Sequence, residues 1–318
     1  MKGLMKAVVT DKYGTAEVLK YQEAEIPVVK EDEILVQVHA SSVNPVDWKI
    51  RKGMMKFITG IKPPKILGGD YSGIVVETGN NIKGYNKGDA VWGSVNSMKG
   101  GAYAKFLKAK NNEIGLKPQN LDFLEAASIP VVGLTAYQSL VYKGGLKAGD
   151  HIIINGCSGG VGFAGLQIAK AFNCRVTGVC STKNIELVKK MGADEVIDYR
   201  KEDVFKNKGI YDIFFDTVGN ISFSQAKAAL KPKGSYVTPV PGFKIMLSWL
   251  IANLTGFKKI KIVFAKLNAM DLNKLKELAE NNKLHPVIEK VYSLDQIREA
   301  HIRSETGRVA GKLVLKIT

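Results

Sequence analysis

A glycine-rich turn between a predicted strand and a predicted helix most constrains how this 318-residue chain can fold. Residues 152–170 read IIINGCSGGVGFAGLQIAK, so an apolar strand enters the turn and helical sequence leaves it. Glycines at this spacing let the backbone approach a pyrophosphate, and the helix N-terminus offers unpaired N–H groups to its oxygens. A glycine-rich turn without a ligand is the alternative, but the strand before it and the helix after it favour dinucleotide binding. The expected contacts are Gly156, Ser158, Gly159, Gly160, Val161 and Gly162.

Predicted strands and helices alternate from the strand before this turn onward. Helical segments at 124–127 and 135–142 come first. Strands are then predicted at 152–155, 175–180, 195–198, 211–216, 234–240 and 260–264, with helices at 162–172, 184–191 and 223–230. Such alternation predicts an α/β fold built on a doubly wound parallel sheet of the Rossmann type.

The two ends of the chain have a different character. Residues 34–40, 72–78 and 89–93 alternate apolar and polar side chains as half-buried strands do, and glycine-marked turns separate them. This pattern predicts a β-rich domain of sandwich or barrel type. The last part of the chain predicts, in order, a helix, a strand, a helix and a strand, at 273–280, 286–291, 294–302 and 312–316.

The end of the second predicted Rossmann strand distinguishes between two nicotinamide cofactors. NAD enzymes usually place an acidic residue about 20 residues after the glycine turn, where it holds the ribose 2′-hydroxyl. Here Cys180 is followed by Ser181, Thr182 and Lys183. A hydroxyl and a cation suit a 2′-phosphate, which a carboxylate would repel. The alternative is a serine N-cap followed by a surface lysine. The sequence favours NADPH, with Ser181 and Lys183 as ligands.

The charge of the chain is strongly basic, with a formal net charge of +16 and a pI of about 9.5. Such a charge attracts nucleic acids, anionic membranes or phosphorylated ligands. The lysines are scattered along the chain and no nucleic-acid-binding motif accompanies them. We therefore expect no nucleic-acid partner and a positive field that helps to gather the cofactor.

Cysteine usage and hydropathy indicate the compartment. The 3 cysteines, Cys157, Cys174 and Cys180, have neither metal-site nor disulfide-framework spacing, which suits a reducing cytoplasm. The N-terminal residues lack the pattern of a signal peptide. The most apolar stretch, 245–257, is shorter than the roughly 20 residues that span a bilayer, and it predicts a buried or pocket-lining helix. We expect a cytoplasmic protein without an integral membrane segment.

Further motifs spread over the chain support a family resemblance. They are Asn44-Pro45-Val46-Asp47, Gly69-Asp70-Tyr71-Ser72-Gly73, Gly88-Asp89-Ala90-Val91, Gly133-Leu134-Thr135-Ala136-Tyr137, the segment 192–199 and Gly311-Lys312-Leu313-Val314. With the glycine turn, they make the chain resemble the zinc-independent quinone oxidoreductase branch of the medium-chain dehydrogenase/reductase superfamily over nearly its whole length. Residues 176–199 are especially similar to chloroplast-envelope quinone oxidoreductase homologues, which reduce unsaturated carbonyls.

The resemblance implies a division of the chain and several site residues. A GroES-like catalytic domain would comprise 1–125 and 285–318, and a Rossmann NADPH-binding domain would comprise 126–284. Many relatives are homodimers. The resemblance adds Thr135, Tyr199, Val218 and Val240 to the expected cofactor contacts. It suggests Asn44, Asp47 and Tyr71 as catalytic candidates.

Each of these candidates has a structural alternative. Asn44 can simply cap a turn, and Asp47 can serve only as a scaffold that holds its loop. Tyr71 and Tyr199 can be packed aromatic residues, and Thr135 an ordinary helix residue.

The resemblance also implies that the chain does not use zinc. Zinc-dependent relatives have a cysteine where this chain has Asn44 and a histidine where it has Gly69. A tetrahedral zinc site needs three or four Cys, His or carboxylate donors. All three cysteines lie in the predicted Rossmann half, and His39, His151, His285 and His301 fall outside the ligand positions.

The preferred hypothesis is an NADPH-dependent oxidoreductase that transfers hydride to a quinone or to the C=C bond of an α,β-unsaturated carbonyl, without zinc. No nucleophile elbow or Ser-His-Asp order supports a hydrolase. The alternative is a catalytically quiet, NADPH-binding scaffold at the membrane surface, because the basic charge and the apolar 245–257 segment suit peripheral contact with anionic lipid.

Overall fold

The computed structural model of the chain describes residues 3–240, 242–254 and 259–318. It forms two compact units, the first comprising Met1–Val131, Leu267–Glu280 and Pro286–Thr318, and the second Val132–Lys266 and Asn281–His285. The main difference from the predicted division is helix α9 (Ala269–Glu280), which belongs to the first unit. The reason is local packing: Asn120 Nδ2 donates to the Ala279 carbonyl at 2.8 Å, and the Gln119 amide donates to the Glu280 carboxylate at 3.0 Å.

The second unit is built on a parallel sheet. Its strands lie in the order β10-β9-β8-β11-β12-β13, and every described pair is parallel. The predicted Rossmann sheet is thereby confirmed. In such a sheet the strand order reverses at its centre, here between β8 and β11, and ligands bind beyond the carboxyl ends of the strands at that point. The bounds are β8 His151–Asn155, β9 Arg175–Cys180, β10 Glu195–Asp198, β11 Tyr211–Asp216, β12 Leu230–Thr238 and β13 Ile260–Ile262.

The helices of the second unit differ from the prediction in two places. The segment predicted as a helix at 135–142 is the end of α4 followed by a π-helical stretch, η2. The apolar segment that begins at residue 245 lies in α8. Ile245 is buried, whereas Met246, Leu247 and Leu250 are exposed. The sequence predicted a buried or pocket-lining helix, and the buried alternative is wrong for these three residues. The pocket-lining alternative stays a prediction. The bounds are α4 Pro130–Tyr137, η2 Gln138–Gly144, α5 Gly160–Ala171, η3 Thr182–Asn184, α6 Ile185–Lys190, α7 Phe223–Ala229 and α8 Phe243–Leu254.

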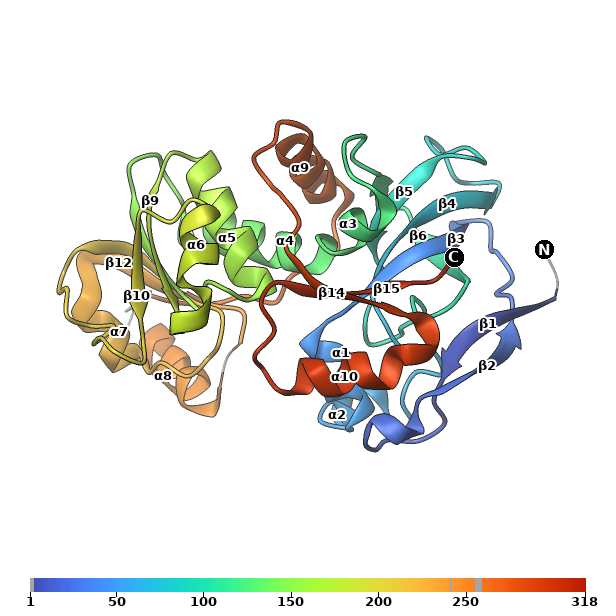
Figure 1. The fold of residues 1–318 in the computed structure, drawn as a ribbon, viewed down its shortest axis with the longest axis horizontal. Helices are drawn as coiled ribbons and strands as arrows, with labels where there is room; N and C mark the ends of the chain where they lie inside the picture. The colour runs from blue at the N-terminus through green and yellow to red at the C-terminus, as the bar shows by residue number, and fades with distance from the viewer. Residues whose placement is uncertain (1–2, 241, 255–258) are drawn as a thin grey trace. The chain divides into compact units, whose positions relative to one another are not determined.

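The first unit has a mainly antiparallel sheet to which both ends of the chain contribute. Its strands lie in the order β14-β15-β3-β4-β5-β7, and β6 also pairs with β3. β1 and β2 form a separate antiparallel pair. Figure 1 shows β15, from the C-terminal end, beside β3 from the N-terminal part. The bounds are β1 Leu4–Val9, β2 Lys20–Glu25, β3 Glu33–Val43, β4 Asp70–Thr78, β5 Ala90–Ser94, β6 Phe106–Lys110, β7 Ile114–Leu116, β14 Ile288–Ser293 and β15 Lys312–Lys316.

Short helices close this unit. Local sequence signals explain where some begin: α1 has a proline at its first position, and α3 starts at a capping box formed by Asp122 and Glu125. The alternating apolar residues predicted for 34–40 lie in β3 and contribute Ile34, Val36 and Val38 to a buried core. The bounds are η1 Ala16–Val18, α1 Pro45–Arg51, α2 Lys56–Thr59, α3 Phe123–Ala127, η4 Leu294–Gln296 and α10 Ile297–Glu305.

No helix in the described parts of the chain has both the length and the apolar character needed to cross a membrane.

Candidate functional site

The glycine turn joins β8 to α5 at the centre of the parallel sheet. Gly156 has a φ of +75°, a conformation that favours glycine, and the Thr217 hydroxyl caps the strand end by donating to the Asn155 carbonyl at 2.7 Å. A Cβ atom on Gly162 would lie 2.2 Å from the Gly156 carbonyl oxygen. The glycine at 162 is therefore what allows the helix to start against the turn.

The start of α5 has the features of a phosphate site. Gly160, Val161 and Gly162 form its first turn, whose N–H groups have no partner within the helix by its geometry. A Cβ atom on Gly159 would meet only the Gly156 carbonyl oxygen, at 3.4 Å, so the space beside this backbone is open. These observations fit a dinucleotide pyrophosphate.

Ser158 lies in the same turn and is tied to the next loop. Asn184 Nδ2 donates to Ser158 Oγ at 2.9 Å. This contact joins the turn after β8 to the loop after β9. The sequence did not single out Asn184, because an asparagine at the start of a predicted helix is an ordinary capping residue.

The predicted 2′-phosphate residues lie together at the carboxyl ends of β9 and β10. Ser181 and Lys183 follow β9, and Tyr199 follows β10, where its amide donates to the Cys180 carbonyl at 3.2 Å. Ser181 is buried, whereas Lys183 and Tyr199 are exposed. Because Tyr199 is exposed, it is not the packed aromatic residue that the alternative supposed.

Two further charged residues stand at this edge. Arg200 is exposed and its amide donates to Asp198 Oδ1 at 3.0 Å. Asp198 also accepts from the Thr182 hydroxyl at 2.5 Å, and these hydrogen bonds lower the pKa of its carboxyl group. Arg200 was not predicted as a site residue, although it directly follows Tyr199 in the sequence.

Asp216 shapes the loop after β11, where Val218 lies. Its buried carboxylate accepts from Asn155 Nδ2 at 2.8 Å, from the Val218 and Gly219 amides at 3.0 Å, and from the Tyr236 hydroxyl at 2.7 Å. The loop is thus held beside the glycine turn.

Val240 follows β12 in the same region of the second unit. Its amide donates to Thr238 Oγ1, and a Cβ atom on Gly219 would lie 2.5 Å from the Val240 carbonyl. Val240 therefore lies close to Gly219, the residue that follows Val218. Thr135 is buried in α4, and its contact with a cofactor stays a prediction.

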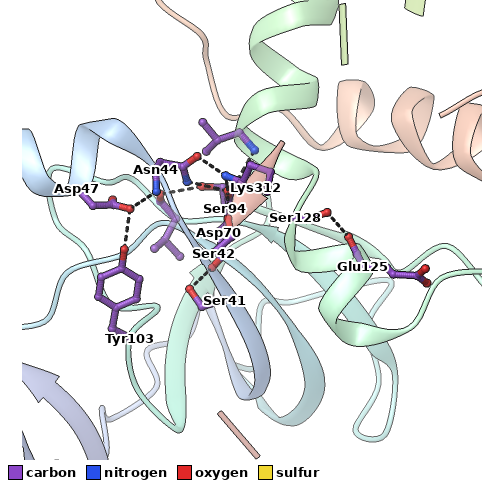
Figure 2. Close-up of polar contacts among 12 residues, drawn as sticks. Ser41, Ser42, Asn44, Asp47, Asp70, Ser94, Tyr103, Glu125, Ser128 and Lys312 are labelled. Carbon is purple, nitrogen blue, oxygen red and sulfur yellow. Dashed lines mark hydrogen bonds and ion pairs between the residues drawn. The ribbon is translucent and has the colours of Figure 1, made fainter. Parts of the chain in front are cut away.

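The first unit contains a buried polar cluster around Asp70 (Figure 2). Asp70 Oδ2 accepts from Ser42 Oγ at 2.8 Å, from Asn44 Nδ2 at 2.7 Å and from Lys312 Nζ at 3.4 Å. Its other oxygen accepts from the Val131 amide at 2.9 Å. Lys312 Nζ also donates to Asn44 Oδ1 at 2.5 Å. The side chain of Asn44 thus binds both Asp70 and Lys312, and Asn44 is also the N-cap residue of α1. We call Ser42, Asn44, Asp70 and Lys312 the Asp70 cluster.

Asp47 is fully buried beside this cluster. Its Oδ2 accepts from the Asn44 amide and from the Tyr103 hydroxyl, each at 2.8 Å. Among the described residues its Oδ1 has no hydrogen-bond partner. Burial raises the pKa of Asp47 to about 7, against the opposing effect of these two hydrogen bonds. These contacts fix the start of α1 and favour a scaffold role for Asp47 over a catalytic one.

The raised pKa of Asp47 predicts a pH-dependent stability. The folded carboxyl group keeps its proton up to about pH 7, whereas the unfolded chain loses it near the ordinary value of 3.8. The neutral carboxyl group therefore contributes its full share of the free energy of unfolding below pH 3.8. This contribution is lost as the pH rises through about 7. We expect denaturant titrations to show wild-type stability falling by up to about 4 kcal/mol over this range relative to Asp47→Asn. Parallel curves for the two proteins would contradict this assignment.

Tyr71 does not fit the role of proton donor. Its side chain is fully buried in the core of the β-rich unit with Val75 and Val91, and its hydroxyl donates to the Glu113 carbonyl at 3.1 Å. Burial also raises the pKa of Tyr71 well above its ordinary value. The prediction of a catalytic Tyr71 is therefore corrected: it is a packed aromatic residue.

We accordingly expect Tyr71→Phe to leave kcat and KM within about 2-fold of wild type while lowering stability by about 1 kcal/mol, because the Glu113 carbonyl loses one donor and keeps the Ser94 amide, at 3.1 Å. Steady-state kinetics and thermal denaturation of the same preparation measure the kinetic constants and the stability. A kcat reduced 100-fold or more with a small change in stability would restore Tyr71 as a candidate.

Zinc independence stays a prediction, which the donor side chains of the described residues favour. No group of three or more His, Cys, Asp or Glu side chains that could hold a metal ion occurs among the described residues. At the two positions where zinc-dependent relatives have ligands stand Asn44, bound to a lysine, and Gly69, where a Cβ atom would lie 2.7 Å from Ser97 Oγ. The cysteines are buried in the second unit, and burial raises the pKa of Cys174 and of Cys180 to about 11.

Two protein-family models match the chain, one in the N-terminal half and one in the C-terminal half. Residues 30–119 match the family model described as alcohol dehydrogenase GroES-like domain, and residues 191–315 match that described as zinc-binding dehydrogenase. The chain is 35% identical to the mitochondrial NAD(P)H oxidoreductase RTN4IP1 of Bos taurus, over 99% of this chain and 89% of that protein.

Two plant proteins and one solved bacterial structure are similar to nearly the whole of this chain. The chain is 33% identical to the chloroplast envelope quinone oxidoreductase homolog of Arabidopsis thaliana, over 98% of each. It is 34% identical to the 2-methylene-furan-3-one reductase of Solanum lycopersicum, over 98% of this chain and 79% of that protein. The structure of the quinone oxidoreductase from Coxiella burnetii matches with a TM-score of 0.90 at 32% identity, covering 99% of this chain and 100% of that one. The chain therefore belongs to the quinone oxidoreductase branch of the medium-chain dehydrogenase/reductase superfamily and is an NAD(P)H-dependent oxidoreductase.

Proposed function

We propose that the protein is an NADPH-dependent reductase of quinones or of the C=C bond of α,β-unsaturated carbonyls, and that it works without zinc. The observation that carries the cofactor assignment is the edge formed by Ser181, Lys183 and Arg200, where hydroxyl and cationic groups stand at the ends of β9 and β10. The carboxylate of Asp198 at this edge is already engaged by Thr182 and the Arg200 amide.

The chemistry follows from what the donors can do. A bound nicotinamide cofactor supplies a hydride. The Asp70 cluster offers a hydroxyl, an amide, a carboxylate and an ammonium group, which are hydrogen-bonding groups and not Lewis acids of the kind that alcohol oxidation needs. A conjugated acceptor needs only hydrogen-bond donors for the oxyanion that forms. The names of the Arabidopsis, tomato and Coxiella relatives point to the same acceptor classes.

Product analysis tests the acceptor class. The chelator-treated protein is incubated with NADPH and a 2-alkenal, and the products are separated by gas chromatography. We expect the saturated aldehyde, because hydride adds to the β-carbon. An allylic alcohol as the main product would show carbonyl reduction and would contradict the proposal.

The cofactor preference can be inverted by one charge. We expect Lys183→Glu to lower the ratio of kcat/KM for NADPH over NADH by about 100-fold, since a carboxylate beside a 2′-phosphate replaces an attractive charge with a repulsive one. The matched control is Lys189→Glu, the same charge change on α6, where Lys189 pairs with Glu186 on the surface. Equal effects of both variants would mean that net charge, and not a phosphate site at 183, sets the preference.

A second candidate function is a membrane-peripheral scaffold. The observation that favours it is a row of exposed apolar side chains on α8, formed by Met246, Leu247, Trp249 and Leu250, on a chain of net charge +16. The side chains of the predicted segment beyond Leu250 lie outside the described residues. Sedimentation with phosphatidylglycerol vesicles at low and high salt tests this reading. Salt-sensitive binding together with no turnover of any acceptor would favour the scaffold over the reductase.

Compartment and assembly also stay proposals. We propose a cytoplasmic homodimer, although the Bos taurus and Arabidopsis relatives are named as mitochondrial and chloroplast-envelope proteins. Light scattering on the purified protein measures the assembly directly.

A further inference from the structure

Lys312 is a buried cation that the proposed hydride transfer leaves unexplained. It begins β15, and its residue is only 5% exposed. A buried ammonium group is destabilising unless it is paired and hydrogen-bonded. Its partners are Asn44 Oδ1 at 2.5 Å and Asp70 Oδ2 at 3.4 Å, so the shorter contact is to the amide and the longer to the carboxylate (Figure 2). The ammonium is placed to act mainly on Asn44.

The polarity of these contacts fixes the orientation of the Asn44 amide. A lysine ammonium can only donate hydrogen bonds, and an ionised carboxylate can only accept them. Asn44 Oδ1 therefore faces Lys312, and Nδ2 faces Asp70 Oδ2, 2.7 Å away. The reverse orientation would set the NH₂ group against the ammonium and the carbonyl against the carboxylate. The backbone is fixed as well, because the Asn44 amide N–H donates to Asp47.

The contact with Lys312 strengthens the remaining amide donor. A charge-assisted hydrogen bond to Oδ1 draws electron density from the amide nitrogen, and linked hydrogen bonds polarise one another in a low-dielectric setting. Asn44 Nδ2 carries two hydrogens, of which one is directed to Asp70. The second is thereby a polarised donor in a fixed direction.

We propose that Lys312 is a positioning residue for the reduction, holding the Asn44 amide so that its second Nδ2–H stabilises the oxyanion that hydride addition creates. This inference rests on the proposed function. Addition of hydride to the β-carbon of an enone breaks the C=C π bond and moves an electron pair to the carbonyl oxygen. A proton from water then completes the saturated product, and NADP⁺ is released.

The test compares Lys312→Met, which removes the cation, with Lys312→Arg, which keeps it. At saturating NADPH we expect Lys312→Met to lower kcat by about 100-fold, the usual effect of losing one oxyanion donor, while the dissociation constant of NADPH stays within about 3-fold of wild type. Lys312→Arg should recover at least about 10-fold of that loss. Unchanged kcat in Lys312→Met, or a loss confined to NADPH binding, would overturn the inference.

A double-mutant cycle separates positioning from a structural role. If Lys312 acts through Asn44, then Asn44→Ala with Lys312→Met should be no slower than Asn44→Ala alone. Additive losses would overturn the inference. If Lys312→Met does not fold because Asp70 loses its partner, the charge-neutral pair Asp70→Asn with Lys312→Met replaces it in the kcat comparison. Inactive wild-type protein would sink the proposed function itself, whereas active wild type with active Lys312→Met sinks only this inference.

Discussion

Replacing Gly162 with alanine is expected to destabilise the second unit by about 3 kcal/mol and to abolish measurable NADPH binding. The added Cβ would lie 2.2 Å from the Gly156 carbonyl oxygen and 2.7 Å from the Cys157 Cα atom, both of them backbone atoms. Overpacking against backbone cannot be relieved by a rotamer change, so the start of α5 or the glycine turn must move. Urea denaturation and fluorescence titration with NADPH measure the two effects.

Gly159→Ala is the matched control because it changes the same turn without a clash. Gly159 has a φ of −84°, which alanine adopts freely, and its added Cβ would meet only the Gly156 carbonyl oxygen, at 3.4 Å. We expect stability within about 0.5 kcal/mol of wild type. NADPH affinity should nevertheless fall at least 10-fold, since the methyl group occupies the space proposed for the pyrophosphate. Wild-type affinity in Gly159→Ala would place the phosphates elsewhere.

The second large effect is expected at Asp70. Asp70→Ala would remove the carboxylate partner of Lys312 and the acceptor for Ser42, Asn44 and the Val131 amide. Removing one partner of a buried, hydrogen-bonded charge pair costs about 3–5 kcal/mol, because the other charge stays buried.

Thermal denaturation of Asp70→Ala beside Glu17→Ala checks this. Glu17 also pairs with a cation, Arg298 Nη1 at 3.1 Å, but its side chain is 72% exposed, so its loss should change stability by less than about 1 kcal/mol. Similar melting temperatures for the two variants would mean that the Asp70 cluster contributes little to the first unit.

The fold of the second unit follows closely from its sequence. The strands at 175–180, 195–198 and 211–216 were predicted with the bounds that β9, β10 and β11 have. Their apolar runs are flanked by polar turns, and the glycine turn fixes the start of α5, so local signals and the global fold agree.

The prediction failed where tertiary contacts override local pattern. Residues 138–144 form a π-helical stretch rather than a continuing α-helix, and no local signal marks that change. Helix α9 joins the first unit through contacts with residues 119 and 120, more than 150 positions away in the chain, which periodicity cannot reveal.

Some residues of the candidate site were predictable from local sequence, and others depend on tertiary contacts. Gly156, Gly162 and Ser181 were predictable because a motif with a mechanism names them. Lys312 was visible only as a lysine in a terminal strand, and its role depends on Asn44 and Asp70, which the sheet brings beside it. Tyr71 was misassigned because an aromatic residue in a motif does not reveal whether its ring faces a core or a ligand.

The most direct test of the central claim is the steady-state oxidation of NADPH by the purified, chelator-treated protein. A quinone, a 2-alkenal and a saturated ketone are offered as acceptors, with NADH in parallel. We expect turnover of the quinone or the alkenal, a preference for NADPH and no turnover of the ketone. Turnover only after zinc is added, or silence with every acceptor despite tight NADPH binding, would contradict the claim.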